Sequence, residues 1–326
     1  MSSYPPLFRQ PIDPSPDSIP IEEAPGEIDH IPVVDLHRLD SERLHDACKN
    51  WGLFRVVNHG VPLHLTTQLQ DQARKLFSLS FESKQGLKKN PVTYFWGTPA
   101  LTPSGSALKG SDQSVNWVEG FNFPISQLSD IDTDNPTLNA FRALLEEYGS
   151  HLEKLASALY ESMAVKIGLD PIQFKTYMDE STGLIRVYRY PPSNSDQVLG
   201  MEEHTDSSVL SILCQDDQVS GLEVWKGERW AKVKPVFGSL VVNLGDMMQA
   251  MSNDVYKSVK HRVKLNNWKE RISIGYFVFP VGDGVIRSRN YKPFCYNEFR
   301  SQVQIDIKSL GCKVGLERFR LTDKHV

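Results

Sequence analysis

The order of hydrophobic and polar residues divides the chain into a mainly helical first half and a strand-rich second half. Apolar residues recur every three or four positions from Pro136 to Ile167, which predicts a long amphipathic helix that stops at Gly168. Similar patterns predict further helices, over residues 41–50, 62–79 and 296–310. Two apolar runs predict short strands, at residues 31–36 and 54–58. We expect the apolar stripe of the long helix to pack against a sheet.

Between residues 183 and 280, short apolar runs alternate with turns that contain Gly, Asp and Asn. The runs predict strands at residues 184–190, 207–213, 222–225, 230–233, 239–243, 258–263 and 273–279. Regularly spaced short strands are typical of a sandwich or barrel, and a double-sheet jelly roll leaves a mouth between its sheets. The predicted fold class is therefore α+β, with a double-stranded β-helix (jelly-roll) core flanked by helices.

Composition and charge exclude several classes of partner. The 326 residues carry a net charge of −4, so the chain lacks the basic footprint expected of a nucleic-acid-binding protein. No apolar stretch reaches the roughly 18 residues of a membrane span, and the N-terminus lacks a secretory signal pattern. The four cysteines show no C-x-x-C spacing, which argues against a disulfide framework or a zinc cluster. We therefore predict a cytoplasmic protein; no segment indicates an oligomeric state.

Candidate metal ligands occur as an H-x-D pair, His204 and Asp206, followed by a distant histidine, His261. Residues i and i+2 of a strand point to the same face, so the pair is expected to converge on one ion. Two imidazoles and one carboxylate occupy one face of an octahedral ion and leave three positions open, which is typical of redox iron. A structural zinc site is the alternative, and it suits this ligand set less well.

An arginine–serine pair, Arg271 and Ser273, follows ten residues after the last histidine and again has i, i+2 spacing on a predicted strand. A guanidinium and a hydroxyl on one face can bind a carboxylate through charge-assisted hydrogen bonds. The combination of an iron site with such a clamp suits a 2-oxo acid that chelates the metal at one end and meets the arginine at the other.

Over about residues 30–315 the chain resembles the plant 2-oxoglutarate- and Fe(II)-dependent dioxygenases. The stretches that carry the resemblance are residues 31–36, 51–60, 190–192, 204–206, 221–222, 242–246, 261–263 and 271–273. Within this family the chain is most similar to gibberellin 2-oxidases that act on C20 gibberellins. That narrower similarity lies in residues 201–213, 243–250 and 276–280.

The resemblance implies that His204, Asp206 and His261 hold Fe(II). It also implies that 2-oxoglutarate is the cosubstrate, with Arg271, Ser273 and Tyr190 at its far carboxylate. O2 is then the oxidant, ascorbate a supporting reductant, and the substrate a small hydrophobic plant metabolite. The predicted reaction is 2β-hydroxylation of a gibberellin, which inactivates the hormone. The alternative is the same chemistry on an alkaloid, a phenolic compound or another terpenoid. A non-catalytic binding protein on the same scaffold is a further alternative, which the intact ligand set and clamp disfavour.

The expected organisation has three parts. Residues 1–29, rich in proline and acidic residues, are predicted to be a flexible N-terminal arm. Residues 30–130 form the N-terminal dioxygenase region, and residues 131–326 the jelly-roll catalytic core with its C-terminal helix. The last two parts are expected to form one compact unit.

The substrate pocket is predicted from strand alternation and from the resemblance. Phe277 and Phe279 extend from Ser273 along one face of the clamp strand, and sandwich core is their alternative place. The other candidates are Trp117 and Phe121, which share one strand face with Glu119, and Met201 and Glu203, which precede the metal ligands. Tyr94 and Trp96 are candidates for a lid. Arg186 and Lys109 could meet a substrate carboxylate, but a solvated or structural charge is the favoured interpretation of both.

Two positions depart from the family pattern. Tyr188 stands where many family members have an Asn that helps to hold the cosubstrate, and Ser193 stands where they have a Cys. The contact made by that Asn is therefore in doubt for this chain, whereas Tyr190 retains the hydroxyl expected near 2-oxoglutarate.

Overall fold

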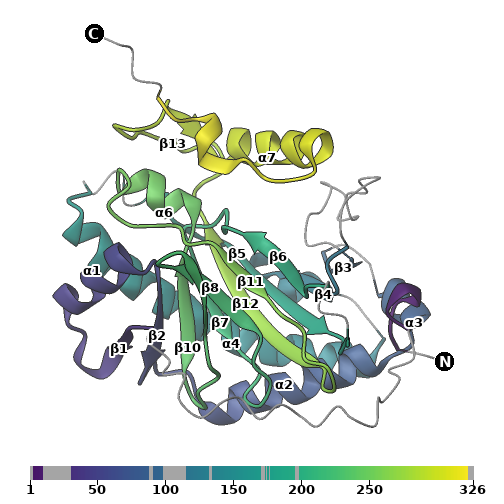
Figure 1. Ribbon diagram of the computed structural model, residues 1–326. Helices are drawn as coiled ribbons and strands as arrows, with labels where there is room; N and C mark the ends of the chain where they lie inside the picture. Colours follow the sequence, from purple (N-terminus) through teal and green to yellow (C-terminus); the bar gives the residue numbers. More distant parts are fainter. Residues whose placement is uncertain are drawn as a thin grey trace.

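The computed structural model describes residues 3–9, 31–87, 91–97, 115–131, 134–169, 173, 175, 177–194 and 198–321. Two β-sheets form its core, with helices around them (Figure 1). The larger sheet has the order β1 (Val33–Asp35), β2 (Leu53–Val57), β10 (Leu240–Leu244), β7 (Leu210–Cys214), β12 (Arg271–Phe279), β5 (Asp179–Tyr190), β4 (Glu119–Pro124) and β3 (Thr93–Trp96). The smaller has the order β6 (Met201–His204), β11 (His261–Val263), β8 (Leu222–Lys226) and β9 (Arg229–Lys232).

The pairing of the strands is antiparallel throughout these two sheets except between β1 and β2. This arrangement agrees with the predicted jelly roll. A short hairpin, β13 (Val285–Ile286) with β14 (Phe294–Cys295), lies outside both sheets. The predicted strands did not include β3 and β4, which extend the larger sheet beyond β5, although the alternating side chains around Glu119 were noted in the sequence.

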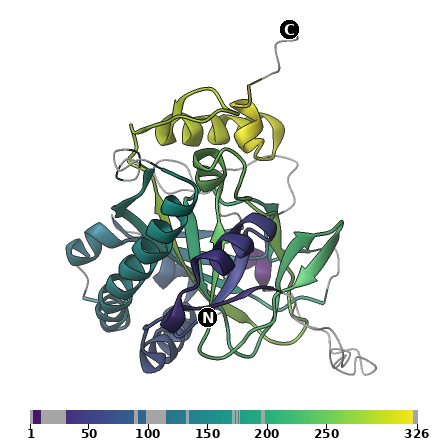
Figure 2. The ribbon, with the colours of Figure 1, turned by 90° about the vertical axis from the view of Figure 1, so that its left-hand side faces the viewer.

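Helices cover the larger sheet and one end of the molecule. Their bounds are α1 (Ser41–Asn50), α2 (Leu63–Ser78), α3 (Phe81–Gly86), α4 (Pro136–Lys166), α6 (Asp246–Met251) and α7 (Tyr296–Leu310), with single 3-10 turns at Pro6–Phe8, Leu36–Arg38, Ile125–Asp130 and Gly315–Arg318. The long helix α4 begins where the Asn135 side chain accepts a hydrogen bond from the Leu138 amide, with Pro136 in its first turn. Helix α7 lies across one end of the sheets in both views (Figures 1 and 2).

The core of the molecule lies between the larger sheet and α2 and α4. Residues along α4 that recur every three or four positions, such as Phe141, Leu145 and Leu152, are fully buried, as the apolar stripe predicted. Helix α1 is capped by Asp40, whose carboxylate accepts hydrogen bonds from the amides of Glu42 and Arg43.

Part of the predicted flexible arm, residues 3–9, is packed onto the body of the protein. The Phe8 ring is buried 4.4 Å from the Trp117 ring and 5.9 Å from the Trp96 ring, measured between centroids. The Ser3 carbonyl accepts a hydrogen bond from Lys84 Nζ at 2.6 Å. The remaining residues of that arm lie outside the described ranges.

Beneath this segment lies a buried ion cluster centred on Glu119 of β4. Its carboxylate pairs with Lys84 at 2.5 Å and with Arg189, and it accepts a hydrogen bond from the Tyr94 hydroxyl at 2.5 Å. Glu119 and Lys84 are completely buried, so their mutual pairing offsets the cost of removing both charges from water. The cluster ties α3, β3, β4 and β5 together on the face of the sheet that the helices cover.

Candidate active site

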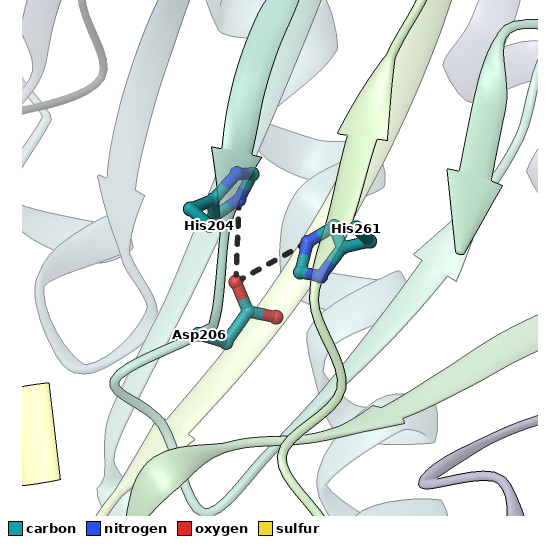
Figure 3. Close-up of side chains that lie close together, drawn as sticks. All are labelled: His204, Asp206 and His261. Atoms are coloured by element: carbon teal, nitrogen blue, oxygen red, sulfur yellow. Dashed lines mark ion pairs between the residues drawn. The ribbon is translucent and has the colours of Figure 1, made fainter. Parts of the chain in front are cut away.

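The three predicted metal ligands meet at the end of the smaller sheet. His204 Nε2 lies 3.8 Å and His261 Nε2 3.7 Å from Asp206 Oδ1. One ligand atom from each residue lies within 4.8 Å of the others, close enough to coordinate a single ion. The side chains point toward a common centre (Figure 3).

Strand pairing positions the two histidines. His204 is the last residue of β6, and it pairs directly with His261, the first residue of β11. Asp206 lies beyond the end of β6, since the next strand, β7, begins only at Leu210. The prediction that His204 and Asp206 converge as i, i+2 residues within a strand is therefore wrong in its mechanism. The turn between β6 and β7 brings the carboxylate back toward the imidazoles.

Neighbouring groups fix the orientation of each ligand. His204 Nδ1 lies 2.7 Å from the Glu202 carbonyl and His261 Nδ1 3.2 Å from the Val259 carbonyl. A carbonyl can only accept, so each Nδ1 carries the proton and each Nε2 is free to bind a metal. Asp206 Oδ2 accepts hydrogen bonds from Ser211 Oγ at 2.5 Å and Asn243 Nδ2 at 2.7 Å. Asn243, which was not among the predicted site residues, thus orients the carboxylate of a candidate metal ligand.

The electrostatics of the cluster prepare it for a cation. Burial and the neighbouring His261 lower the pKa of His204 to about 3, so this imidazole is neutral at physiological pH. Burial opposes ionisation of Asp206, but His261 and His204 outweigh it and lower the pKa of Asp206 to about 2. Two nitrogen donors and one ionised carboxylate on one side of a cavity suit Fe(II) with open coordination positions.

The predicted cosubstrate clamp lies on β12 beside the metal ligands. Arg271 is 2% exposed, and its Nε and Nη1 atoms have no hydrogen-bond partner among the described residues. Its Nη2 donates to Gln215 Oε1 at 3.3 Å, and its guanidinium lies 5.3 Å from the centroid of the Tyr190 ring. Ser273 is also buried. A buried guanidinium with two unsatisfied N–H groups is costly unless an anion meets it, which fits the far carboxylate of 2-oxoglutarate.

Tyr188 occupies the place beside this clamp. It pairs with Ser273 in the sheet, its ring stacks on that of Tyr190 with centroids 6.1 Å apart, and it is 5% exposed. Burial raises the pKa of Tyr188, Arg186 opposes that rise, and Asp206 adds to it. The phenol that replaces the usual Asn is therefore a neutral group on the cavity wall, close to the metal ligands.

A cavity of about 570 Å³ joins the metal ligands, the clamp and α7. Of the residues predicted to contact substrate, Phe277, Phe279 and Met201 line it. The other lining residues that the argument below uses come from β3, β4, β5 and α7, namely Thr93, Asn122, Arg186, Tyr296, Arg300, Val303, Gln304 and Ile307.

The remaining predicted substrate residues lie elsewhere. Phe121 is completely buried against Phe77 and Tyr94, on the helix-facing side of β4. Trp117 packs against Phe8, and Glu203 is exposed and pairs with Lys260 at 3.4 Å. Alternation along β4 was predicted correctly, but the wrong face was assigned to the pocket, because the face of Glu119 and Phe121 packs against the helices.

The proposed lid is also misplaced. Tyr94 points into the Glu119 ion cluster, and Trp96 packs edge-on against Phe8 and Phe81. The pocket-facing residue of β3 is Thr93. Lys109 lies outside the described residues.

The sequence analysis did not assign Arg186 or the residues of α7 to the cavity. Arg186 was interpreted as a solvated or structural charge, yet it lines the cavity. It shares the strand face of Tyr188 and Tyr190, so its i, i+2, i+4 spacing from a predicted cosubstrate residue was a usable signal. The lining face of α7 had no such signal, because an amphipathic pattern does not show which surface a helix will cover.

Comparisons with known proteins place these features in context. Residues 181–280 match the profile of the 2OG-Fe(II) oxygenase superfamily, and residues 31–141 match that of the non-haem dioxygenase in morphine synthesis N-terminal region. Gibberellin 2-beta-dioxygenase 8 of Arabidopsis thaliana is 37% identical over 89% of this chain and 86% of its own length. Gibberellin 2-beta-dioxygenase 6 of Oryza sativa subsp. japonica is 34% identical over 89% of this chain and 84% of its own.

Other relatives are named for reactions on substrates other than gibberellins. Codeine O-demethylase of Papaver somniferum is 33% identical over 80% of this chain and 71% of its own length. Among solved structures, JOX2 in complex with 2OG, Fe and JA superimposes with a TM-score of 0.73 at 28% identity, covering 90% of this chain and 89% of that one. No helix in the described parts of the chain is long and apolar enough to cross a membrane.

Proposed function

The chain belongs to the 2OG-Fe(II) oxygenase superfamily, and from this premise we propose that it catalyses the 2β-hydroxylation, and thereby the inactivation, of a gibberellin. The observation that carries the proposal is the similarity to gibberellin 2-beta-dioxygenases, at 34–37% identity over most of both chains. The cavity supports it, because its lining places apolar side chains such as Leu184, Phe277 and Ile307 beside polar and cationic groups, which suits a terpenoid acid.

In this proposal His204, Asp206 and His261 hold the iron, and Arg271, Ser273 and Tyr190 hold the far carboxylate of 2-oxoglutarate. The bound metal and cosubstrate supply the oxidising power: one oxygen atom of O2 enters the substrate C–H bond, the other enters succinate, and CO2 leaves. The protein orients one C–H bond toward the iron and keeps water from the site. Asn243 and Ser211 keep the Asp206 carboxylate in place during turnover.

A second candidate function is the same reaction on a different plant metabolite. Jasmonate-induced oxygenase 1 of Arabidopsis thaliana is 31% identical over 92% of this chain. The feature of this chain that favours a changed substrate is Tyr188, which puts a phenol on the cavity wall where the family usually has Asn.

The proposal is tested by incubating the protein with Fe(II), 2-oxoglutarate, ascorbate and a panel of C19 and C20 gibberellins, with product mass as the readout. The expected product is heavier by one oxygen atom and is absent with His204→Ala. If no gibberellin reacts but anaerobic Fe(II) and 2-oxoglutarate still give a visible charge-transfer band, the chain retains dioxygenase chemistry and the gibberellin assignment is wrong. Absence of that band from folded protein contradicts both candidate functions.

A further inference from the structure

The charges that line the cavity are unbalanced. Its described lining contains four cationic side chains, Arg186, Arg271, Arg300 and Lys313, but one carboxylate, that of Asp206. Two of the cations are accounted for. Lys313 Nζ pairs with Asp246 at 2.6 Å, and Arg271 serves the cosubstrate. An Fe(II) ion, Asp206, doubly charged 2-oxoglutarate and Arg271 together sum to zero net charge.

Arg186 and Arg300 therefore remain as uncompensated positive charges once metal and cosubstrate are bound. No acidic side chain lies within ion-pair distance of either one in the described part of the chain. Arg189, the neighbouring arginine of β5 on the opposite face, shows the contrast, because it pairs with the buried Glu119. Arg186 is partly buried, and a partly buried cation without a counter-ion is unfavourable in the free protein and favours an anionic ligand, whereas Arg300 is exposed.

The surroundings of Arg186 hold its guanidinium over the cavity. It lies 5.3 Å from the centroid of the Phe277 ring, in a cation–π contact, and its Nε is buried without a hydrogen-bond partner among the residues that the structure describes. Gly275, the partner of Arg186 on β12, leaves room for this arrangement. A Cβ atom at position 275 would lie 2.9 Å from Cε2 of the Phe277 ring and would displace it.

Arg300 reaches the same end of the cavity from α7. It lies one helical turn after Tyr296, and both residues line the cavity. Burial raises the pKa of the Tyr296 phenol, and Arg300 and Arg186 both oppose that rise. Arg186 on β5 and Arg300 on α7 are therefore both close enough to Tyr296 to affect its phenol. Arg186 belongs to the larger sheet and is partly buried, whereas Arg300 is exposed to solvent.

We propose that Arg186, assisted by Arg300, binds a carboxylate of the organic substrate and so restricts this enzyme to acids. The inference rests on the proposed dioxygenase function and deepens it, because it names the group by which the substrate is recognised. Charge-assisted bonds to Arg186 fix the acid, whereas an amine cation meets like charge and is rejected. Of the alternatives left open by the sequence, alkaloids are thereby disfavoured, and gibberellins and other carboxylic acids are favoured.

The test compares acids with their methyl esters on protein loaded with Mn(II) and 2-oxoglutarate, using calorimetric binding of gibberellins, jasmonic acid and indole-3-acetic acid. We expect at least one acid to bind roughly 30-fold or more tightly than its ester, the discrimination typical of a partly desolvated charge pair. Arg186→Gln should reduce acid binding to the level of the ester, with ester binding unchanged, and Arg300→Gln should do so in part.

Two further variants make the result interpretable. Arg186→Lys keeps the charge and should keep part of the preference for acids over esters. Lys308 lies at an exposed position of α7 and does not line the cavity, so Lys308→Gln should leave the binding of acids and esters unchanged. Unchanged 2-oxoglutarate affinity shows that each variant is folded.

The inference is overturned if acids and esters bind equally, if Arg186→Gln weakens both equally, or if no acid binds while the anaerobic Fe(II)–2-oxoglutarate band forms. Acid discrimination without binding of any gibberellin supports the inference and contradicts only the gibberellin assignment. Absence of the band is instead a failure of the dioxygenase function itself.

Discussion

The two ends of the cavity are built in different ways. At the metal end, each ligand is held by a further protein group: His204 and His261 by backbone carbonyls, and Asp206 by Ser211 and Asn243. At the substrate end, the walls come from β3, β4, β5, β12 and α7, and in the described part of the chain Arg186 Nε and Asn122 Oδ1 are buried without hydrogen-bond partners.

This difference separates chemistry from specificity. The metal end tolerates little change, because each ligand needs one orientation and one protonation state. The substrate end is assembled from elements that are distant along the chain, so a single residue there can change what binds without disturbing the iron. Relatives named for gibberellin, jasmonate and codeine chemistry, at 31–37% identity, are consistent with such a division.

The largest expected effect concerns β4, because one face of this strand packs against the helices and the other lines the cavity. Phe121→Ala removes a completely buried ring and should cost about 3–5 kcal/mol of unfolding free energy, without altering the preference for acids over esters. Urea denaturation and the calorimetric assay measure the two quantities. The matched variant Asn122→Ala, on the cavity face, should change substrate affinity at a stability cost of about 1 kcal/mol. If Phe121→Ala altered the preference for acids over esters, Phe121 would have to contact the substrate, and its assignment to the helix-facing side would be wrong.

Arg271 and Arg186 should differ in which ligand depends on them. Removing the charge in Arg271→Gln should weaken 2-oxoglutarate binding by about 3 kcal/mol, or roughly 100-fold, because a buried charge pair loses one partner. Titration of the anaerobic charge-transfer band measures this affinity, and Arg271→Lys should recover part of it. If Arg186→Gln has the same effect on 2-oxoglutarate, the two ends are not separate sites.

The hydrogen bonds around Asp206 test how far the metal end depends on its supporting groups. Asn243→Ala should lower the affinity for Fe(II) or Mn(II) by about 10–100-fold, since the freed carboxylate loses its orientation. Metal titration under anaerobic conditions gives the value. Ser239→Ala is the control and should leave metal affinity unchanged, because the Ser239 hydroxyl donates to the Val236 carbonyl in a turn and does not line the cavity.

The buried imidazole of His204 should make the metal-free protein sensitive to acid. Its pKa is about 3 in the folded protein and 6.5 ordinarily, so between these values the unfolded chain binds more protons and stability rises with pH. The contribution is at most about 1.4 kcal/mol per pH unit. Unfolding free energies measured between about pH 5 and 6.5 should rise less steeply in His204→Gln than in the wild type. Equal slopes in wild type, His204→Gln and the exposed control His64→Gln would contradict the assignment.

The success of sequence analysis differs between the same two ends. Motif spacing identified His204, Asp206 and His261, which the structure brings together. It did not identify Asn243 as a partner of Asp206, because nothing local links two residues 37 positions apart. For β4 it recognised alternation but chose the wrong face. Period-two patterning shows that a strand has two faces, and only the packing of α2 and α3 decides which one meets the cavity.

The sequence by itself determined the fold class and the candidate residues for the iron site and the cosubstrate clamp. Hydrophobic periodicity is a local property, and the H-x-D and R-x-S pairs with a histidine between them form a recognisable order of residue types. Tertiary structure alone decided that α7 lies over the cavity and that Phe121 and Trp117 turn away from it. It also decided that Arg186 has no acidic partner among the described residues, while Arg189, on the other face of the same strand, pairs with Glu119. The physical reason is that burial and charge pairing depend on which distant surfaces pack together. A local sequence pattern does not specify the surface against which a helix or strand will pack.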